Sequence, residues 1–154
     1  MRNQREGVIH MSFENPSREE IGEILAAAGN IAVVGLSDKT DRTSYMVAGA
    51  MQSRGYRIIP VNPSVEGEIL GEKCYHTLAE IPEPVDIVNV FRRSEYCAAV
   101  AQEAADIGAR VLWLQQGIIS QEAADIAAAH DMIAIMDRCI KVEEAITMKG
   151  RSRG

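Results

Sequence analysis

Residues 31–44 read IAVVGLSDKTDRTS, and this stretch decides the fold that we expect. The apolar run of residues 31–34, rich in β-branched side chains, predicts a buried strand that stops at Gly35. A polar loop follows, and an apolar pattern with helical spacing begins near Tyr45. A strand, a glycine-containing loop and a helix N-terminus together predict an anion site, because free backbone N–H groups and the helix dipole converge there.

The glycine pattern of this loop is not that of the common nucleotide-binding motifs. Only Gly35 of the three glycines in G-x-G-x-x-G is present, and the Walker A lysine pattern is missing. Where an NAD-binding site has an acid after the second strand for the ribose, this chain has Asn62. We therefore expect the loop to bind a phosphate group in another way.

Outward from this stretch, predicted strands and helices alternate along the chain. The predicted strands are apolar throughout and span residues 31–34, 57–61, 86–90, 110–114 and 132–136. The predicted helices begin near Ser17, Tyr45, Ser94, Ser120 and Lys141; Ser17 opens a capping box, and Ser44, Ser94 and Ser120 are expected N-caps. Residues 62–84 are expected to form a loop. Strands without alternation are buried on both faces, which predicts a three-layer α/β fold with about five parallel strands and helices on both faces.

The length, composition and net charge of the chain indicate one domain of ordinary globular type. The chain has 154 residues, of which 47% are hydrophobic and 25% charged, and a net charge of -6. We expect an N-terminal arm over 1–16, the domain over 17–148 and a tail over 149–154. No stretch is long enough to span a membrane or resembles a signal peptide, and the acidic charge disfavours nucleic acid. Three cysteines without CxxC spacing indicate reduced thiols in the cytoplasm, with neither a disulfide nor a metal site.

Basic side chains gather where the predicted strands end. In a parallel sheet all carboxyl ends meet at one edge, and ligands bind there. The residues expected at this edge include five cations, Lys39, Arg42, Arg92, Arg93 and Arg138. An edge of this kind suits a ligand with several phosphates, and an extra ribose phosphate fits it better than NAD does.

Several segments, in order along the chain, resemble the small stand-alone CoA-binding proteins of bacteria, which are similar to the CoA-binding N-terminal domain of the succinyl-CoA synthetase α subunit. They are VGLS (34–37), GYRIIPVNP (55–63), ILGE (69–72), IPEPVD (81–86), VFRR (90–93), LWLQ (112–115) and MDRCIK (136–141). The resemblance covers roughly residues 17–148 and implies a Rossmann-like fold with coenzyme A (CoA) as the ligand. The phosphohistidine and ATP-grasp domains of the synthetases have no counterpart in this chain, so their thioester-forming activity does not carry over.

The resemblance also implies which residues contact CoA. Phosphates would bind at Gly35, Leu36, Ser37, Lys39, Arg42 and Ser44. The adenosine would be bordered by Val61, Asn62 and Pro63, with Phe91, Arg92 and Arg93 beside the nucleotide. The pantetheine would approach residues 113–117, including Gln115 and Gly117.

We interpret the chain as a non-catalytic binder of CoA or a short acyl-CoA, and a homodimer is compatible with its size. Three alternatives stay open. The first is an NAD(P)-binding domain like those of redox sensors. The second is an enzyme that processes acyl-CoA with Cys139 or Asp137, both at the end of the last predicted strand. The third is an interaction domain whose pocket binds no nucleotide.

Overall fold

A central sheet of five parallel strands organises the protein. The computed structural model describes residues 13–149. The strands are β1 (Asn30–Val34), β2 (Arg57–Val61), β5 (Ile87–Val90), β6 (Val111–Leu114) and β7 (Ile133–Ile135). They lie in the order β2-β1-β5-β6-β7, and every neighbouring pair is parallel. The chain therefore builds the sheet outward in both directions from β1 and β5, whose carboxyl ends form its switch point.

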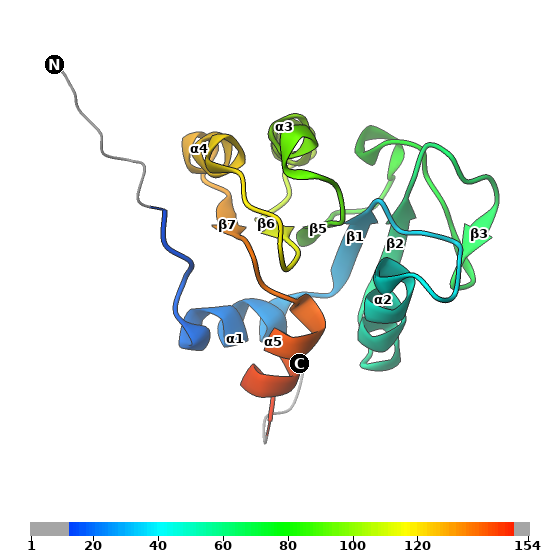
Figure 1. The fold of residues 1–154 in the computed structure, drawn as a ribbon, viewed down its shortest axis with the longest axis horizontal. Coiled ribbons are helices and arrows are strands. Elements are labelled where there is room, and N and C mark those ends of the chain that lie inside the picture. The colour runs from blue at the N-terminus through cyan, green and yellow to red at the C-terminus, as the bar shows by residue number, and fades with distance from the viewer. Residues whose placement is uncertain (1–12, 150–154) are drawn as a thin grey trace, which may run out of the picture.

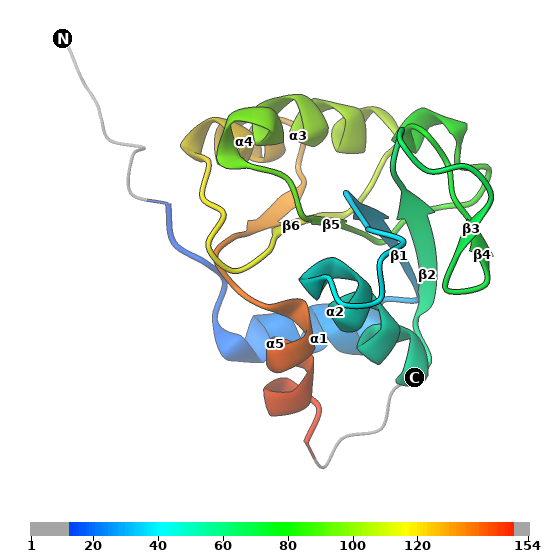
Figure 2. The same cartoon turned by 45° about the vertical axis from the view of Figure 1, so that its right-hand side comes forward.

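Helices cover both faces of this sheet, which confirms the predicted three-layer α/β fold (Figure 1). The face toward the bottom of Figure 1 carries α1 (Arg18–Ala27), α2 (Thr43–Ser53) and α5 (Ile140–Thr147). The opposite face carries α3 (Cys97–Asp106) and α4 (Gln121–Ala129), which lie side by side in both views (Figure 2).

Successive residues of each strand fill two separate apolar cores. In β1, Ala32 and Val34 belong to the core under α3 and α4, whereas Ile31 and Val33 belong to the core under α1, α2 and α5. Because both faces are buried, the strands are apolar without alternation, which is the pattern that predicted them. Trp113 of β6 is fully buried in the second core, where its indole N–H donates to the Arg138 carbonyl at 2.9 Å.

Two of the four predicted N-caps are confirmed and two are wrong. Ser17 forms its capping box with Glu20, and Ser120 accepts from the Ala123 N–H. In contrast, α2 begins at Thr43, so Ser44 lies inside it, and Ser94 begins the short 3-10 helix η3 (Ser94–Tyr96) without capping α3. Both hydroxyl groups accept instead from N–H groups elsewhere in the chain: Ser44 Oγ from Ser37 at 3.0 Å, and Ser94 Oγ from Ile119 at 3.3 Å.

Residues 62–84, expected as a loop, contain a small hairpin. Strands β3 (Glu68–Ile69) and β4 (Glu72–Lys73) pair antiparallel, and the 3-10 helix η2 (Leu78–Glu80) follows. Leu70 and Gly71 form the two-residue turn with φ of 56° and 76°. Strands of two residues are too short for an alternating pattern, so periodicity could not reveal them.

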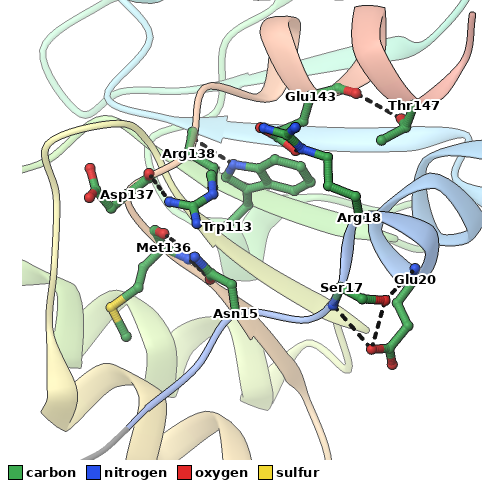
Figure 3. A network of polar contacts seen from close by, with 10 residues as sticks. All are labelled: Asn15, Ser17, Arg18, Glu20, Trp113, Met136, Asp137, Arg138, Glu143 and Thr147. Atoms are coloured by element: carbon green, nitrogen blue, oxygen red, sulfur yellow. Dashed lines mark hydrogen bonds and ion pairs between the residues drawn. The ribbon is translucent and has the colours of Figure 1, made fainter.

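The ends of the chain are only partly described. Residues 1–12 of the expected arm and 150–154 of the expected tail lie outside the described range. Asn15 is described, and its side-chain amide pairs with both backbone groups of Met136, at 2.8 and 2.9 Å (Figure 3). The packed chain therefore starts before Ser17. Between residues 13 and 149 no helix has the length and apolarity that crossing a membrane requires.

Candidate functional site

The loops that follow the five parallel strands are linked to one another across the carboxyl edge of the sheet. The loop after β2 contacts the loop after β1 through the Asn62 amide, which donates to the Leu36 carbonyl at 2.9 Å. Gly35, directly after β1, packs on Phe91 and Arg92, directly after β5. The loops after β5, β6 and β7 are joined by the Ser94–Ile119 and Gly117–Asp137 hydrogen bonds. The residues that the resemblance places around CoA thus lie along one continuous edge.

Gly35 is required by packing at the end of β1. Its φ is +87°, and a Cβ there would lie 2.5 Å from the Phe91 carbonyl oxygen and 3.2 Å from Arg92 Cδ. Its N–H donates to the Val61 carbonyl at 2.9 Å. That N–H is therefore used within the sheet, and the glycine acts by letting the β1 and β5 backbones approach closely.

The loop between β1 and α2 is held by its own serines. Ser44 is buried, and its hydroxyl accepts from the Ser37 N–H; Ser37 Oγ in turn accepts from the Lys39 N–H at 3.0 Å. The N–H groups of Thr43, Ser44 and Tyr45 lie in the first turn of α2, where no carbonyl four residues earlier belongs to the helix and can accept from them. The loop thus presents the positive end of the α2 dipole at the switch point.

Asn62 links two loops. Besides donating to the Leu36 carbonyl, it accepts from the Ser64 N–H at 2.8 Å. An aspartate could accept but not donate, so the amide explains why no acid stands at this position. The side chains of Leu36 and Val61 are buried, whereas Pro63 is exposed next to Asn62.

Most of the basic residues of this edge have no acidic partner in the part of the chain that the structure describes. Among residues 13–149, Lys39, Arg42, Arg92 and Arg138 have no carboxylate within ion-pair distance, and Arg93 approaches Glu95 only at 3.9 Å. Elsewhere Arg18, Arg54 and Arg57 all pair with glutamates at 3.0 Å or less. The protein is acidic overall, yet five cations lie along this one edge, and four of them have no acidic partner among residues 13–149.

Tyr96 is a residue of this edge that no sequence motif singled out. The Cζ atoms of Arg92 and Arg93 lie 4.6 and 5.4 Å from its ring centroid. Its hydroxyl accepts from Arg93 Nη2 at 3.1 Å, and this hydrogen bond is the main cause that raises the pKa of Arg93. An aromatic residue three and four positions after two arginines is a signal in the sequence, although it becomes a contact only because η3 turns the chain there.

Farther along the edge, the residues after β6 and β7 contact one another. Gln115 is buried, and its Oε1 accepts from Asn89 Nδ2 and from the Ile140 N–H, both at 3.3 Å. Gly117 donates its N–H to Asp137 Oδ1 at 2.8 Å. Arg138 donates to the Asp137 carbonyl, as Figure 3 shows beside Trp113.

The three thiols lie in different surroundings. Cys139 is half-buried at the N-cap of α5, and its side chain makes no capping hydrogen bond. Cys74 and Cys97 are buried, and burial raises the pKa of both thiols. A raised pKa keeps a thiol protonated and inert at neutral pH.

Two hollows lie away from the basic edge. One of about 250 Å³ is found among α1 and the amino ends of β5 to β7 and is lined partly by Asp86, Arg110 and Ile133. The other, of about 610 Å³, lies beside the β3–β4 hairpin and has three glutamates, Glu66, Glu68 and Glu80, in its lining. Carboxylates disfavour phosphates, so neither hollow suits a polyanion. Among residues 13–149 no cluster of His, Cys, Asp and Glu could hold a metal ion.

Comparison with known proteins assigns the family. The CoA binding domain model matches residues 29–145. The uncharacterized protein YneT of Bacillus subtilis (strain 168) is 53% identical over 135 residues, which are 88% of this chain and 99% of that protein. The solved structure of a hypothetical protein from Pyrococcus horikoshii OT3 is 31% identical with a TM-score of 0.84, covering 96% of this chain and 99% of its own.

A larger protein shares the fold alone. The dinucleotide-forming acetyl-coenzyme A synthetase 1 of Ca. Korarchaeum cryptofilum is 21% identical, with a TM-score of 0.64 over 71% of this chain and 26% of its own. The family match covers most of the chain and agrees with the motifs read from the sequence. The chain belongs to the CoA binding domain family.

Proposed function

We propose that this protein binds coenzyme A, or a short acyl-CoA, at the carboxyl edge of its sheet without catalysing a reaction. The observation that carries the proposal is the set of cations at the carboxyl edge of a CoA binding domain, next to the first turn of α2; four of these five cations have no ion-pair partner among residues 13–149. A loop that presents free N–H groups and a helix dipole suits a pyrophosphate, and nearby guanidinium groups add charge-assisted hydrogen bonds.

We assign the adenosine and the pantetheine of CoA to the loops that lie next to the proposed phosphate site. The adenosine lies beside Asn62 and Pro63, where the loops after β1 and β2 are joined. The pantetheine runs along the edge toward Gly117 and the buried Gln115, after β6. This assignment is supported by the order of the loops along the sheet, since β1 separates β2 from β5 and β6.

The absence of catalysis belongs to the proposal as well. The Asp137 carboxylate accepts a backbone N–H from Gly117, which favours a role in holding two loops. Burial raises the pKa of Cys74 and Cys97, so neither supports a thiolate mechanism. Cys139 is the thiol to test: hydrolysis of acetyl-CoA by the wild type that is lost in Cys139→Ala would contradict the proposal, whereas equal background rates in both proteins support it.

Thermal unfolding with CoA, dephospho-CoA, NAD and NADP tests the proposed ligand. A ligand that binds only the folded state adds about 2.7 kcal/mol of stability at about 100 times its dissociation constant. We expect a clear rise of the transition temperature with CoA and none with NAD. A rise with NAD or NADP but not with CoA would favour a dinucleotide-binding domain, and no rise with any of the four would favour an interaction domain.

Substitution of one arginine at each edge of the sheet tests the proposed location of the CoA site. Arg42→Gln removes an unpaired cation beside the first turn of α2, and Arg110→Gln removes an exposed arginine at the opposite, amino edge of the sheet. Hydrogen bonds to charged groups contribute about 1.5–3 kcal/mol, so we expect Arg42→Gln to weaken CoA about tenfold or more. Isothermal titration should show Arg110→Gln close to wild type; equal losses in both variants would place the ligand elsewhere.

A further inference from the structure

We propose that Tyr96 is a positioning residue that holds Arg92 and Arg93 as a pair for a phosphate monoester, which in CoA is the 3′-phosphate. The inference rests on the proposed function and adds to it the group that sets specificity for CoA over dephospho-CoA. It assigns the pyrophosphate to the β1–α2 loop and the monoester to the β5–η3 segment.

Three contacts hold the two guanidinium groups on one ring. Arg92 Cζ lies 4.6 Å and Arg93 Cζ 5.4 Å from the Tyr96 centroid, and Arg93 Nη2 donates to the Tyr96 hydroxyl at 3.1 Å. The backbone under the cluster is fixed too, since the Tyr96 N–H donates to the Arg93 carbonyl at 2.9 Å. The Cys97 thiol is a further donor to the Arg92 and Arg93 carbonyls, at 3.7 and 3.5 Å.

The aromatic contact leaves the donors of Arg92 unused. Among the residues that the structure describes, its guanidinium has no carboxylate and no hydrogen-bond acceptor, while its Cδ lies 3.2 Å from the point that a Cβ on Gly35 would occupy. A guanidinium has five N–H donors, and a cation–π contact with a ring uses none of them. The guanidinium N–H groups of Arg92, which follows β5 at the switch point, therefore remain free among the described residues to donate to an anion.

The charge of the cluster matches a monoester better than a pyrophosphate. Two guanidinium groups within 4.6 and 5.4 Å of one ring centroid give about two positive charges around Tyr96, and among the described residues the only carboxylate in ion-pair distance of them is Glu95, 3.9 Å from Arg93. A phosphate monoester carries about −1.5 to −2 on a single phosphorus at neutral pH, whereas each phosphate of a pyrophosphate diester carries about one. The monoester is therefore the part of CoA that gains most from a paired guanidinium site.

The test measures dissociation constants of CoA and dephospho-CoA by isothermal titration for wild type, Tyr96→Leu and Tyr96→Phe in the full chain. Tyr96→Leu removes the ring and the hydroxyl, and we expect it to weaken CoA about tenfold while dephospho-CoA changes less than about twofold. Tyr96→Phe keeps the ring and loses only the hydrogen bond to Arg93, so its dissociation constant for CoA should lie between those of wild type and Tyr96→Leu. Tyr96 is 39% exposed, so both variants should fold, and their unfolding transitions verify it.

Glu95→Gln is the neighbouring control. It leaves Tyr96 in place and removes the carboxylate that lies 3.9 Å from Arg93, so CoA affinity should stay constant or rise. The proposal is overturned if Tyr96→Leu weakens CoA and dephospho-CoA equally, if it weakens neither, or if Glu95→Gln weakens CoA as much as Tyr96→Leu does. Failure of the proposed function looks different, because the wild type would then bind neither ligand and the inference would fall with it.

Discussion

At the residue scale, Gly35 and Gly117 show that one backbone conformation can have two different reasons. Both have a backbone φ of +87°, a conformation that residues with a Cβ rarely adopt. A Cβ on Gly35 would collide with the Phe91 carbonyl oxygen at 2.5 Å, whereas a Cβ on Gly117 would meet nothing within 4 Å. Gly35 is therefore required by conformation and by packing, and Gly117 by conformation alone.

Alanine at each of these glycines should separate the two causes. We expect Gly117→Ala to lower the free energy of unfolding by about 1–2 kcal/mol, the cost of a left-handed residue. Gly35→Ala should cost more, about 3 kcal/mol or above, because the close backbone contact adds to that strain. Urea denaturation of both variants measures the difference, and equal losses would show that the Phe91 contact relaxes freely.

Asn62 carries a second prediction at this scale. Asn62→Asp keeps the acceptor for Ser64 but places a carboxylate oxygen where the amide donates to the Leu36 carbonyl, at 2.9 Å. We expect a loss of about 1–3 kcal/mol in the free energy of unfolding, since the carbonyl loses its donor and faces a negative charge. Urea denaturation at neutral pH checks it; a variant as stable as wild type would show that the link between the two loops is dispensable.

At the element scale, the helices differ in how they begin. Helix α4 starts with a side-chain cap from Ser120, whereas α3 continues from η3 and has no side-chain cap. Ser94 stands where a cap was predicted, but its hydroxyl accepts from Ile119 in the loop after β6. A serine before an apolar periodic stretch therefore marks the start of a helix correctly without revealing what its hydroxyl contacts.

Removing the two hydroxyl groups should have different consequences. Ser120→Ala should lower the free energy of unfolding by about 1 kcal/mol, the usual cost of an N-cap. Ser94→Ala removes an exposed hydrogen bond of 3.3 Å, so we expect about 0.5 kcal/mol or less. Urea denaturation of the pair tests this, and a larger loss for Ser94→Ala than for Ser120→Ala would contradict it.

At the scale of the whole molecule, some cations are paired with glutamates and others have no acidic partner among residues 13–149. Arg57 bridges Glu83, at 2.6 and 2.7 Å, and Glu72, at 3.0 Å, which connects β2 with β4 and with the segment before β5. Hydrogen bonding to Arg57 lowers the pKa of Glu83. At the carboxyl edge Lys39, Arg42, Arg92 and Arg138 have no ion-pair partner among residues 13–149, and Arg93 approaches Glu95 only at 3.9 Å; these are the cations that we propose for the ligand.

The Arg57–Glu83 pair makes stability depend on pH in a known direction. A carboxylate whose pKa is lowered in the folded state stabilises above its unfolded pKa, and this contribution disappears as the pH falls through its folded pKa. Glu83→Gln should therefore be less stable than wild type at neutral pH, by about 1 kcal/mol or less because the pair is partly exposed, and should converge with it in acid.

Urea denaturation of wild type and Glu83→Gln across the acid range measures this convergence. Glu103→Gln is the control, an exposed glutamate of α3 without an ion pair among the described residues. A constant difference between wild type and Glu83→Gln at every pH would show that ionisation of Glu83 does not contribute to the difference in stability.

The sequence by itself determined the layers, the parallel sheet and the family. Strands buried on both faces must be apolar throughout, so residues 31–34 and 57–61 could be read as sheet without any contact being known. The ordered motifs from VGLS to MDRCIK were specific enough to predict the CoA binding domain. These features depend on local pattern and order, which a linear sequence contains.

Only the tertiary structure decided what individual polar groups do. The Ser44 hydroxyl accepts from the Ser37 N–H, and the Asn62 amide donates to the Leu36 carbonyl. Gln115 is buried and accepts from the first N–H of α5, and the Tyr96 ring contacts the guanidinium groups of two arginines. The Asn62 and Gln115 contacts depend on where another segment lies, and the Ser44 and Tyr96 contacts depend on how their own loop turns; hydrogen bonds and cation–π contacts act only over a few ångströms. Sequence spacing does not specify such distances, because they follow from how the five loops pack along the edge of the sheet.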